Sequence, residues 1–517
     1  MIPFRAPVDD ILFSLRAVAG AADLPGLDDP LAADIISHFA AFAEGVIAPL
    51  DAPGDAQGCR LDNGRVRMPD GFKAAYAQLA EGGWQGLSAP EAHGGMAAHP
   101  LVAAAVSEVF SGANMSLQMV CNLVPGAITT LMRFGSPDQQ ARFVPPLVSG
   151  DMLATMCLTE PQAGSDLAAI RTRAVPTSDG WQISGEKIFI SGGDQDMSDG
   201  ILHLVLARTG AADAGVKGLS LFLCPADLAD GRNAVTVARI EDKLGLHASP
   251  TCHLVFDDAQ AELIGAEGQG LAVMFTLMNH ARLDVALQGV AKAARAAQIS
   301  QAYAIDRKQG RKPDGSAATL ADHADVARML DEQTRLAVVG LAMCHLAFAT
   351  GARGQGALFD FLTPICKIFC SEAGIRAADL GMQILGGYGY LTEYGLGQIW
   401  RDARVTAIYE GATGIHARAL STRLLQQGTG ANDFAAMVCG IAGDTADVAA
   451  LLARWEHARG MVIAAADPLP LAHDFAQLTA KLYFHAAWAR NVAAAEGTPR
   501  AQDYARLAAG LSAGPFG

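Results

Sequence analysis

The spacing of apolar residues changes twice along this chain, and the two changes limit the folds that it can adopt. From about Asp28 to Leu147, apolar residues recur at the spacing of amphipathic helices. From Met152 to about Gly265 they instead form short runs, rich in Val, Ile, Leu and Thr and separated by turns, which are typical of β-strands. Helical spacing then returns in three long stretches, at residues 271–307, 320–350 and 363–385. This order predicts an α+β protein with several domains.

We expect four segments along the chain, because its 517 residues are too many for one hydrophobic core. Residues 1–150 would form an N-terminal helical domain, and residues 151–265 a middle domain built as a small β-barrel or sandwich. Residues 266–427 would form a helical bundle. The last segment, residues 428–517, is Ala-rich and amphipathic without a motif typical of chemistry, so we expect an additional helical segment there.

The balance of charge argues against nucleic acid as a partner. The chain carries 38 Lys and Arg against 53 Asp and Glu, a formal charge of -15, so its overall field would not attract a polyanion. Two acids, Asp9 and Asp10, lie where a secretory signal would have its apolar run. No later apolar stretch reaches the length of a membrane span without a Gly or a charge. We therefore expect a cytoplasmic protein that does not bind membranes.

Metal-binding and nucleotide-loop motifs are not found in the sequence. The nine cysteines are scattered, with one close pair at Cys366 and Cys370, and none of the 13 histidines has metal-ligand spacing, so we expect no metal. Three glycine-containing segments, at residues 192–193, 265–270 and 386–389, do not fit Gly-x-Gly-x-x-Gly between a strand and a helix. Gly-x-Ser-x-Gly is also absent, so a nucleophilic serine of the hydrolase type is not indicated.

Four separated motifs carry a resemblance to a known family. They are MCLTEPQAGSD at residues 156–166, KIFISGG at 187–193, LGMQILGGYGY at 380–390 and WRDARVTAIYEGATG at 400–414. In this order they resemble the acyl-CoA dehydrogenase family, over roughly residues 30–425. The resemblance implies an acyl-CoA dehydrogenase-like fold with an N-terminal helical domain, a middle β-barrel or sandwich domain and a C-terminal four-helix bundle. Three further segments, RAPVDDILFSL, EGGWQGLSAPEAHGG and TLMNHARL, are most similar to the 3-(methylthio)propanoyl-CoA dehydrogenase branch.

The resemblance implies FAD-dependent α,β-dehydrogenation of an acyl-CoA thioester to the trans-2-enoyl-CoA. In this family a carboxylate removes the α-proton while the β-hydrogen leaves as hydride to N5 of FAD. The Tyr-Glu-Gly motif of the family is Tyr409-Glu410-Gly411 here, so Glu410 is the expected catalytic base. Some relatives carry the base immediately before an Arg of the C-terminal domain, where this chain has Ala281 before Arg282. Such a base needs a raised pKa and a site that stabilises the oxyanion of the thioester.

The resemblance also implies which residues bind FAD. Thr159 would hydrogen-bond the flavin near N5 and O4, and Phe189 would pack on the ring edge, where the family often has Trp. Arg307 would meet the pyrophosphate, and the adenosine half would be held partly by a neighbouring subunit. The sequence departs from the family at Gln309, where Phe is frequent, and at Ala412, where Thr often follows Glu-Gly. The expected FAD-binding residues are Met156, Leu158, Thr159, Gly164, Ser165, Phe189, Ile190, Ser191, Arg307, Gln309, His323, Gln383, Gly386, Gly387, Ala412 and Gly414.

Substrate contacts are implied by the same resemblance, each with an alternative. Ser165 matches a Ser near the pantetheine, and Asn279 and Arg282 match the segment that meets CoA, although Arg282 is also suited to anchor an ion pair. The acyl pocket of the family corresponds to residues 113–126, whose methionines are either a flexible substrate wall or ordinary core. The expected substrate-binding residues are Ser165, Asn279, Arg282, Gly411, Met115 and Met119.

The resemblance further implies the partners of the chain. Electrons would pass to an electron-transfer flavoprotein, and the chain would form a homo-oligomer, either a dimer or a dimer of dimers. An acyl-CoA oxidase of the same fold, which returns electrons to oxygen, fits the same motifs. A flavoprotein relative without dehydrogenase activity that associates with nucleic acid is opposed by the charge of -15 and by Glu410. The expected substrates are 3-(methylthio)propanoyl-CoA or a short- or medium-chain acyl-CoA.

Overall fold

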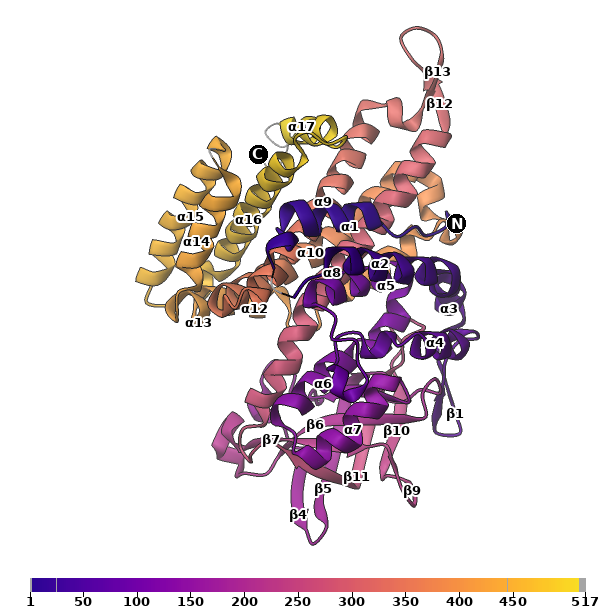
Figure 1. Cartoon of the computed structure of the whole chain (residues 1–517), viewed down its shortest axis with the longest axis vertical. Coiled ribbons are helices and arrows are strands. Elements are labelled where there is room, and N and C mark those ends of the chain that lie inside the picture. The colour runs from indigo at the N-terminus through magenta and orange to yellow at the C-terminus, as the bar shows by residue number, and fades with distance from the viewer. Residues whose placement is uncertain (1, 25, 444, 511–517) are drawn as a thin grey trace. The chain divides into compact units, whose positions relative to one another are not determined.

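The computed structural model of the chain (Figure 1) describes residues 2–24, 26–443 and 445–510. The side chains at 212, 279 and 280 lie outside this description. Internal contacts divide the chain into two compact units. The helical unit comprises Met1–Glu44, Pro100–Ala113 and Arg282–Gly517, and the sheet unit comprises Gly45–His99 and Asn114–Ala281.

The sheet unit contains a seven-stranded sheet that closes on itself. Its strands are β3 (Met152–Cys157), β4 (Arg173–Thr177), β5 (Gly180–Ser191), β6 (Gly200–Arg208), β7 (Leu219–Pro225), β10 (Val235–Ile240) and β11 (Thr251–Ile264). The strand order is β10-β11-β5-β4-β6-β3, and β7 pairs with both β11 and β6. The strands β11, β5, β4, β6 and β7 therefore form a closed ring, which is the small barrel that the short apolar runs predict.

Burial in this barrel follows the apolar runs of the sequence. Strands β6 and β7 have apolar residues at consecutive positions, and nearly every residue along them is buried. A short hairpin of β8 (Asp227–Leu228) and β9 (Gly231–Arg232) lies outside the main sheet. The core of the barrel is therefore formed by strands whose residues are buried on both faces.

The sheet unit also contains helices. They are α3 (Asp51–Gln57), α4 (Phe72–Glu81), α6 (Leu123–Phe134) and α7 (Pro137–Ser149), together with the end of α5 (Pro100–Cys121). Helices α6 and α7 both contact β3. Helix α7 begins with a capping box, in which the Ser136 side chain accepts from the N–H of Gln139 while the Gln139 side chain accepts from the N–H of Ser136. Within α5, Asn114 is non-helical and caps the next turn by accepting from the N–H of Leu117 at 3.0 Å.

The helical unit is built around three long helices. Its elements are α1 (Val8–Phe13), α2 (Asp29–Phe42), α8 (Gly270–Asp306, from residue 282), β12 (Lys308–Arg311), β13 (Ala317–Thr319), α9 (Ala324–Ala352), α10 (Gly356–Leu385), α11 (Leu396–Arg404), α12 (Thr413–Ser421), α13 (Arg423–Gln426), α14 (Gly430–Ala442), α15 (Ala446–Ala464), α16 (Ala472–Ala495) and α17 (Ala501–Ala509). Helix α2 starts where the sequence predicts, because the Asp28 side chain accepts from the N–H of Leu31 at 3.1 Å and Pro30 follows the cap.

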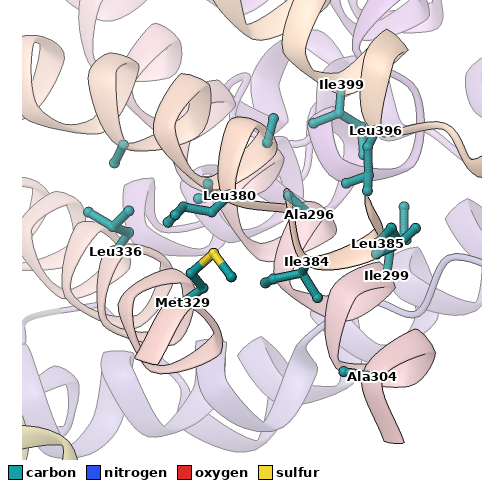
Figure 2. Packing of buried hydrophobic residues seen from close by; sticks show 14 residues of the cluster. Ala296, Ile299, Ala304, Met329, Leu336, Leu380, Ile384, Leu385, Leu396 and Ile399 are labelled. Atoms are coloured by element: carbon teal, nitrogen blue, oxygen red, sulfur yellow. The ribbon is translucent and has the colours of Figure 1, made fainter. Parts of the chain in front are cut away.

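Small and branched apolar side chains from four helices form one core in this unit. Figure 2 shows Met329 and Leu336 of α9 facing Leu380 and Ile384 of α10, and it shows Ile399 of α11 next to Leu396. Alanines from α8 and α10 complete the cluster, and their small size lets the helix backbones approach closely. The core residues are 5% exposed or less, so hydrophobic burial holds these helices in register.

The C-terminal helices pack on two of the long helices, α9 and α10, and share a core with them. Helix α16 contacts α9, α10, α12, α14 and α15, and α14 to α16 lie side by side in Figure 1. Trp455 of α15 is fully buried, donates to the Thr479 hydroxyl at 2.9 Å and stacks on Phe475. Tyr483 of α16 donates to the Met343 carbonyl at 2.9 Å. These contacts make residues 430–509 an integral part of the helical unit.

The structure corrects three expectations from the sequence. A hairpin of β1 (Arg60–Asp62) and β2 (Arg65–Arg67) interrupts the N-terminal helices, because Asn63 and Gly64 adopt positive φ values of 49° and 76° and form the tight turn. The motif MCLTEPQAGSD, which its place among the short apolar runs predicts to lie in a strand, is mostly a loop, because β3 ends at Cys157. The third long helix begins at Gly356 and continues through Pro364 instead of starting at Thr363.

Two helical stretches of the described residues are long and apolar enough to cross a membrane, by length and composition alone. They are Asp29–Gln57 and Ala324–Ala352, and a bent pair, Pro100–Cys121 with Leu123–Phe134, would make a third. The apolarity of Ala324–Ala352 has a second explanation, because 67% of its most apolar window is buried in the protein. The apolar surface of this helix contacts α10 and α16.

A glycine contact between α8 and α10 gives a test of this packing. A Cβ added at Gly289 would lie 2.2 Å from the Cys370 carbonyl oxygen, so we expect Gly289→Ala to lower the free energy of unfolding by about 1–3 kcal/mol or more. The matched control is Gly460→Ala in α15, where a Cβ meets nothing within 4 Å. This change should raise stability by up to about 1 kcal/mol. Thermal or denaturant unfolding of both variants measures the difference, and equal stabilities would contradict the observed packing.

Candidate active site

Glu410 lies in a strained turn that precedes helix α12. Its φ is 53°, in the left-handed region that non-glycine residues rarely adopt, and Gly411 follows with φ 97°. Such a conformation costs of order 1–3 kcal/mol and persists only where the surroundings enforce it. A carboxylate on a strained backbone of this kind is a candidate functional group.

Two cations lie near the Glu410 carboxyl. Although some surface of the Glu410 side chain is accessible, protein atoms enclose its carboxyl, and this burial raises its pKa to about 7. Arg282 of α8 and Lys367 of α10 partly oppose the rise, because their positive charges favour the ionised carboxylate. Burial in turn lowers the pKa of Lys367 to about 8, and Glu410 opposes that change. Burial also lowers the pKa of Arg282. The three groups thus form a buried charged cluster whose acid titrates near neutral pH.

The backbone of the turn is held by two side chains from other elements. The Lys367 Nζ donates to the Gly411 carbonyl at 2.6 Å, and the side chain of Lys367 is fully buried. His416 of α12 donates from Nε2 to the Glu410 carbonyl at 3.1 Å. Burial, together with the nearby cations, lowers the pKa of His416 to about 3, so this imidazole is neutral and carries its proton on Nε2. Two successive carbonyls are therefore fixed by buried donors.

A hydrogen-bond network holds Tyr409, the residue before Glu410. The Tyr409 hydroxyl donates to the Gln288 side-chain oxygen, and Gln288 donates to Asp284 at 3.4 Å. The Ser107 hydroxyl also donates to Asp284. Burial raises the pKa of Tyr409 well above its usual value, so the phenol stays protonated and remains a donor. This network anchors the turn from the side of α8.

In the sheet unit, a buried ion pair holds the loop that follows β3. Lys187 of β5 lies 2.8 Å from Glu160 and also donates to the Leu158 carbonyl at 2.9 Å. Glu160 accepts from the N–H groups of Arg171 and Thr172 as well. Burial alone would raise the pKa of Glu160, but Lys187 and these N–H groups outweigh it, so its pKa is lowered. The loop is thereby fixed against β5.

The predicted flavin residues of the sheet unit lie around this fixed loop. Phe189 at the end of β5 is 60% exposed and has a φ of 60°, which is unusual for a large aromatic residue. Thr159 and Ser191 are half-buried, and Gly164 and Ser165 are exposed. Met156 is half-buried in β3, whereas the other two predicted residues, Leu158 and Ile190, are buried.

Four of the predicted FAD-binding residues line one hollow of the helical unit. The hollow has a volume of about 520 Å³, and Arg307 lies above the Tyr388 ring on its wall, 5.5 Å from the ring centroid. His323 binds the Gln309 carbonyl at 2.8 Å and so lies beside the hollow. The predicted residues that line it are Arg307, Gln309, Gly386 and Gly387.

The remaining predicted residues lie elsewhere. Gln383 is exposed on α10 and does not line the hollow, while Ala412 and Gly414 are exposed at the start of α12. Met115 and Met119 are buried in the sheet unit, with exposed fractions of 0% and 7%. The side chain of Asn279 lies outside the described residues.

Sequence reasoning missed the residues that hold the two loops, namely Lys367, His416, Lys187 and Glu160. Each is a single charged or polar residue within an otherwise apolar or motif segment, such as PICKIFC around Lys367. A buried Lys inside an apolar helix is rare unless it is paired, so that pattern was an available signal.

The chain is similar to known proteins along most of its length. Family models for the acyl-CoA dehydrogenase N-terminal, middle and C-terminal domains match residues 32–151, 155–259 and 268–425. The 3-methylmercaptopropionyl-CoA dehydrogenase of Ruegeria pomeroyi is 43% identical over 474 residues, which are 85% of this chain and 80% of that protein.

Solved structures show the same likeness. The butyryl-CoA dehydrogenase of Megasphaera elsdenii matches with a TM-score of 0.68 and 27% identity, covering 78% of this chain and 99% of that chain. An acyl-CoA dehydrogenase complexed with FAD from Bacillus anthracis shares the fold, with a TM-score of 0.77 and 20% identity over 94% of this chain and 86% of that chain.

The protein is thus an FAD-dependent oxidoreductase with three successive domains of one known type. The chain belongs to the acyl-CoA dehydrogenase family. The family, fold class and enzyme class that the motifs predict are confirmed.

The turn geometry predicts the effect of adding one methyl group. A Cβ at Gly411 would lie 2.8 Å from the His416 Nε2, and φ 97° disfavours any other residue, so Gly411→Ala should lower stability by about 1–3 kcal/mol. Gly397→Ala in α11 is the control, because its Cβ meets nothing within 4 Å. Thermal unfolding with and without FAD measures both, and a Gly411→Ala protein as stable as the control would refute the described turn.

Proposed function

We propose that this acyl-CoA dehydrogenase uses Glu410 to remove the α-proton of an acyl-CoA thioester and yields the trans-2-enoyl-CoA. The observation that carries the proposal is the buried Glu410 carboxyl, whose pKa is raised to about 7 in a strained, anchored turn. A carboxylate with this pKa is a stronger base than an ordinary Glu and is still substantially ionised at neutral pH.

The surroundings of Glu410 suit a group that accepts and keeps one proton. Arg282 and Lys367 offset the loss of solvent enough for the carboxylate to form, but burial still dominates and the pKa stays raised. Once protonated, Glu410 is neutral, so the enclosed site loses an unfavourable charge. Proton transfer to Glu410 is therefore favoured by the same burial that raises its pKa.

The proposed FAD contacts fit the chemistry of that cofactor. Exposed Phe189 offers an aromatic surface to a planar ring, and the half-buried hydroxyls of Thr159 and Ser191 offer hydrogen bonds. Arg307 offers a positive charge for a pyrophosphate, and Gly386 and Gly387 present backbone without side chains beside it. When bound, FAD supplies the acceptor for the hydride that leaves the β-carbon.

We propose 3-methylmercaptopropionyl-CoA as the substrate and an electron-transfer flavoprotein as the acceptor of the electrons. The substrate proposal is supported by the 43% identity to the dehydrogenase of that name, and the acceptor by membership in the family. Met115 and Met119 are proposed as the flexible wall of the acyl pocket, because unbranched thioether side chains adapt to acyl groups of differing shape. A homo-oligomer and a cytoplasmic location complete the proposal.

The base is tested by Glu410→Gln, which keeps the shape of the side chain and removes the proton acceptor. Flavin reduction by a good acyl-CoA should fall by about 10³-fold or more, measured by stopped-flow absorbance under anaerobic conditions. In the unaltered enzyme, kcat/KM should rise with pH through a midpoint near 7, because Glu410 must lose its proton before it can act as a base. Glu456→Gln, at an exposed position of α15, is the control and should behave as the native enzyme. Retained reduction in Glu410→Gln would refute the assignment.

The substrate is tested by flavin bleaching with a panel of thioesters. We expect kcat/KM for 3-methylmercaptopropionyl-CoA to exceed that for octanoyl-CoA by at least about 10-fold, with butyryl-CoA between them, because a pocket discriminates by the methylenes it accommodates. Admitting air after reduction separates a dehydrogenase, which reoxidises slowly, from an oxidase. A preference for octanoyl-CoA would exclude the proposed substrate without affecting the role of Glu410.

A further inference from the structure

The Glu410–Gly411 turn is held at two consecutive peptide groups by side chains from two different helices. His416 of α12 binds the Glu410 carbonyl, and Lys367 of α10 binds the Gly411 carbonyl. Both residues are buried, with exposed fractions of 3% and 0%. The turn is thus fixed by donors that solvent does not replace.

The two hydrogen bonds restrict the orientation of the Glu410 side chain, because peptide groups are planar. Each peptide group is planar, so a carbonyl that is held in place fixes the orientation of its whole plane. The plane after Glu410 is set by His416, and the plane after Gly411 is set by Lys367. Because Glu410 has a positive φ, its backbone is strained, and the turn would relax if either anchor were removed.

Lys367 differs from His416 because it carries a charge next to the carboxyl. The groups that face Glu410 are Arg282 from α8, Lys367 from α10, His416 from α12 and the adjacent Tyr409. Arg423 of α13 acts on Arg282, and Glu372 acts on Lys367. Among these groups, Arg282 and Lys367 favour the ionised form of Glu410, and His416 is neutral. Lys367 therefore acts on Glu410 both through the backbone and through its charge.

We propose that Lys367 is a positioning residue for catalysis, which holds the Glu410–Gly411 turn by its hydrogen bond to the Gly411 carbonyl and places a positive charge near the Glu410 carboxyl. This inference rests on the proposed role of Glu410 as the base. Lys367 contacts the turn and not the reacting atoms, so it acts through Glu410.

Two substitutions separate the two effects of Lys367. Lys367→Met removes the charge and the donor, whereas Lys367→Gln removes the charge and keeps a donor toward the Gly411 carbonyl. In both variants the midpoint of the pH profile of flavin reduction should move upward by about one pH unit, because an opposite charge beside Glu410 has been lost. The plateau rate at high pH should fall by about 10²-fold in Lys367→Met, since a displaced base reacts poorly, and recover in part in Lys367→Gln. KM should change little in either variant.

Lys292→Met is the matched control for loss of a buried lysine. Lys292 of α8 is 1% exposed and lies 3.9 Å from Asp402, and the cations that act on Glu410 are Arg282 and Lys367. We expect this variant to lose thermal stability while its pH midpoint and plateau rate stay those of the native enzyme. If Lys367→Met does not accumulate as folded protein, the upward shift in Lys367→Gln carries the test.

A purely structural role for Lys367 gives a different result. Variants at Lys367 that lose thermal stability but keep the native midpoint and plateau rate would overturn the proposal. That outcome is distinct from failure of the proposed base, which would show as retained flavin reduction in Glu410→Gln. An inactive Glu410→Gln together with unshifted Lys367 variants would therefore refute only the role of Lys367.

Discussion

The charge of a carboxylate is costly in a protein interior, and the site depends on how that cost is offset at Glu410. Burial raises the pKa of this residue to about 7, and Arg282 and Lys367 prevent a larger rise. The two cations come from α8 and α10, so their distance from the carboxyl depends on how these helices pack. The close approach at Gly289 and the alanine-rich core in Figure 2 fix that packing. Helix packing thus sets the proton affinity of Glu410.

In the sheet unit a buried lysine also holds a loop carbonyl, but there the pKa of the nearby carboxylate is lowered. Lys187 and Lys367 are both fully buried, and each donates to a loop carbonyl, that of Leu158 and that of Gly411. Lys187 also pairs directly with Glu160, which accepts further N–H groups, so the pKa of Glu160 is lowered. Glu160 is therefore fixed as a structural anion, whereas Glu410 titrates near neutral pH. The donors around each carboxylate decide whether its pKa is lowered, as at Glu160, or raised, as at Glu410.

The sequence predicted the fold class because each segment has its own apolar period. The long helices, the turn-bounded strands and the cap of α2 at Asp28 all follow from local patterns. The β1–β2 hairpin was missed although its Asn63-Gly64 turn is a strong local signal, because the surrounding periodicity is helical. The expected FAD residues came from a motif match, which identifies positions without their exposure: Leu158 and Ile190 are buried, and Gln383 is exposed outside the hollow.

What the sequence by itself determined was the family, the order of helical and β segments and the identity of Glu410 as the candidate base. These are properties of local pattern and motif, which a linear chain displays directly. The tertiary structure alone decided that Lys367 and His416 hold the Glu410 turn and that Lys187 holds the loop after β3. Lys367 and Gly411 are 44 positions apart in the chain, and Leu158 and Lys187 are 29 apart, so only folding brings each donor to its carbonyl. The raised pKa of Glu410 is likewise a product of folding, because burial and the nearby charges exist only in the packed protein.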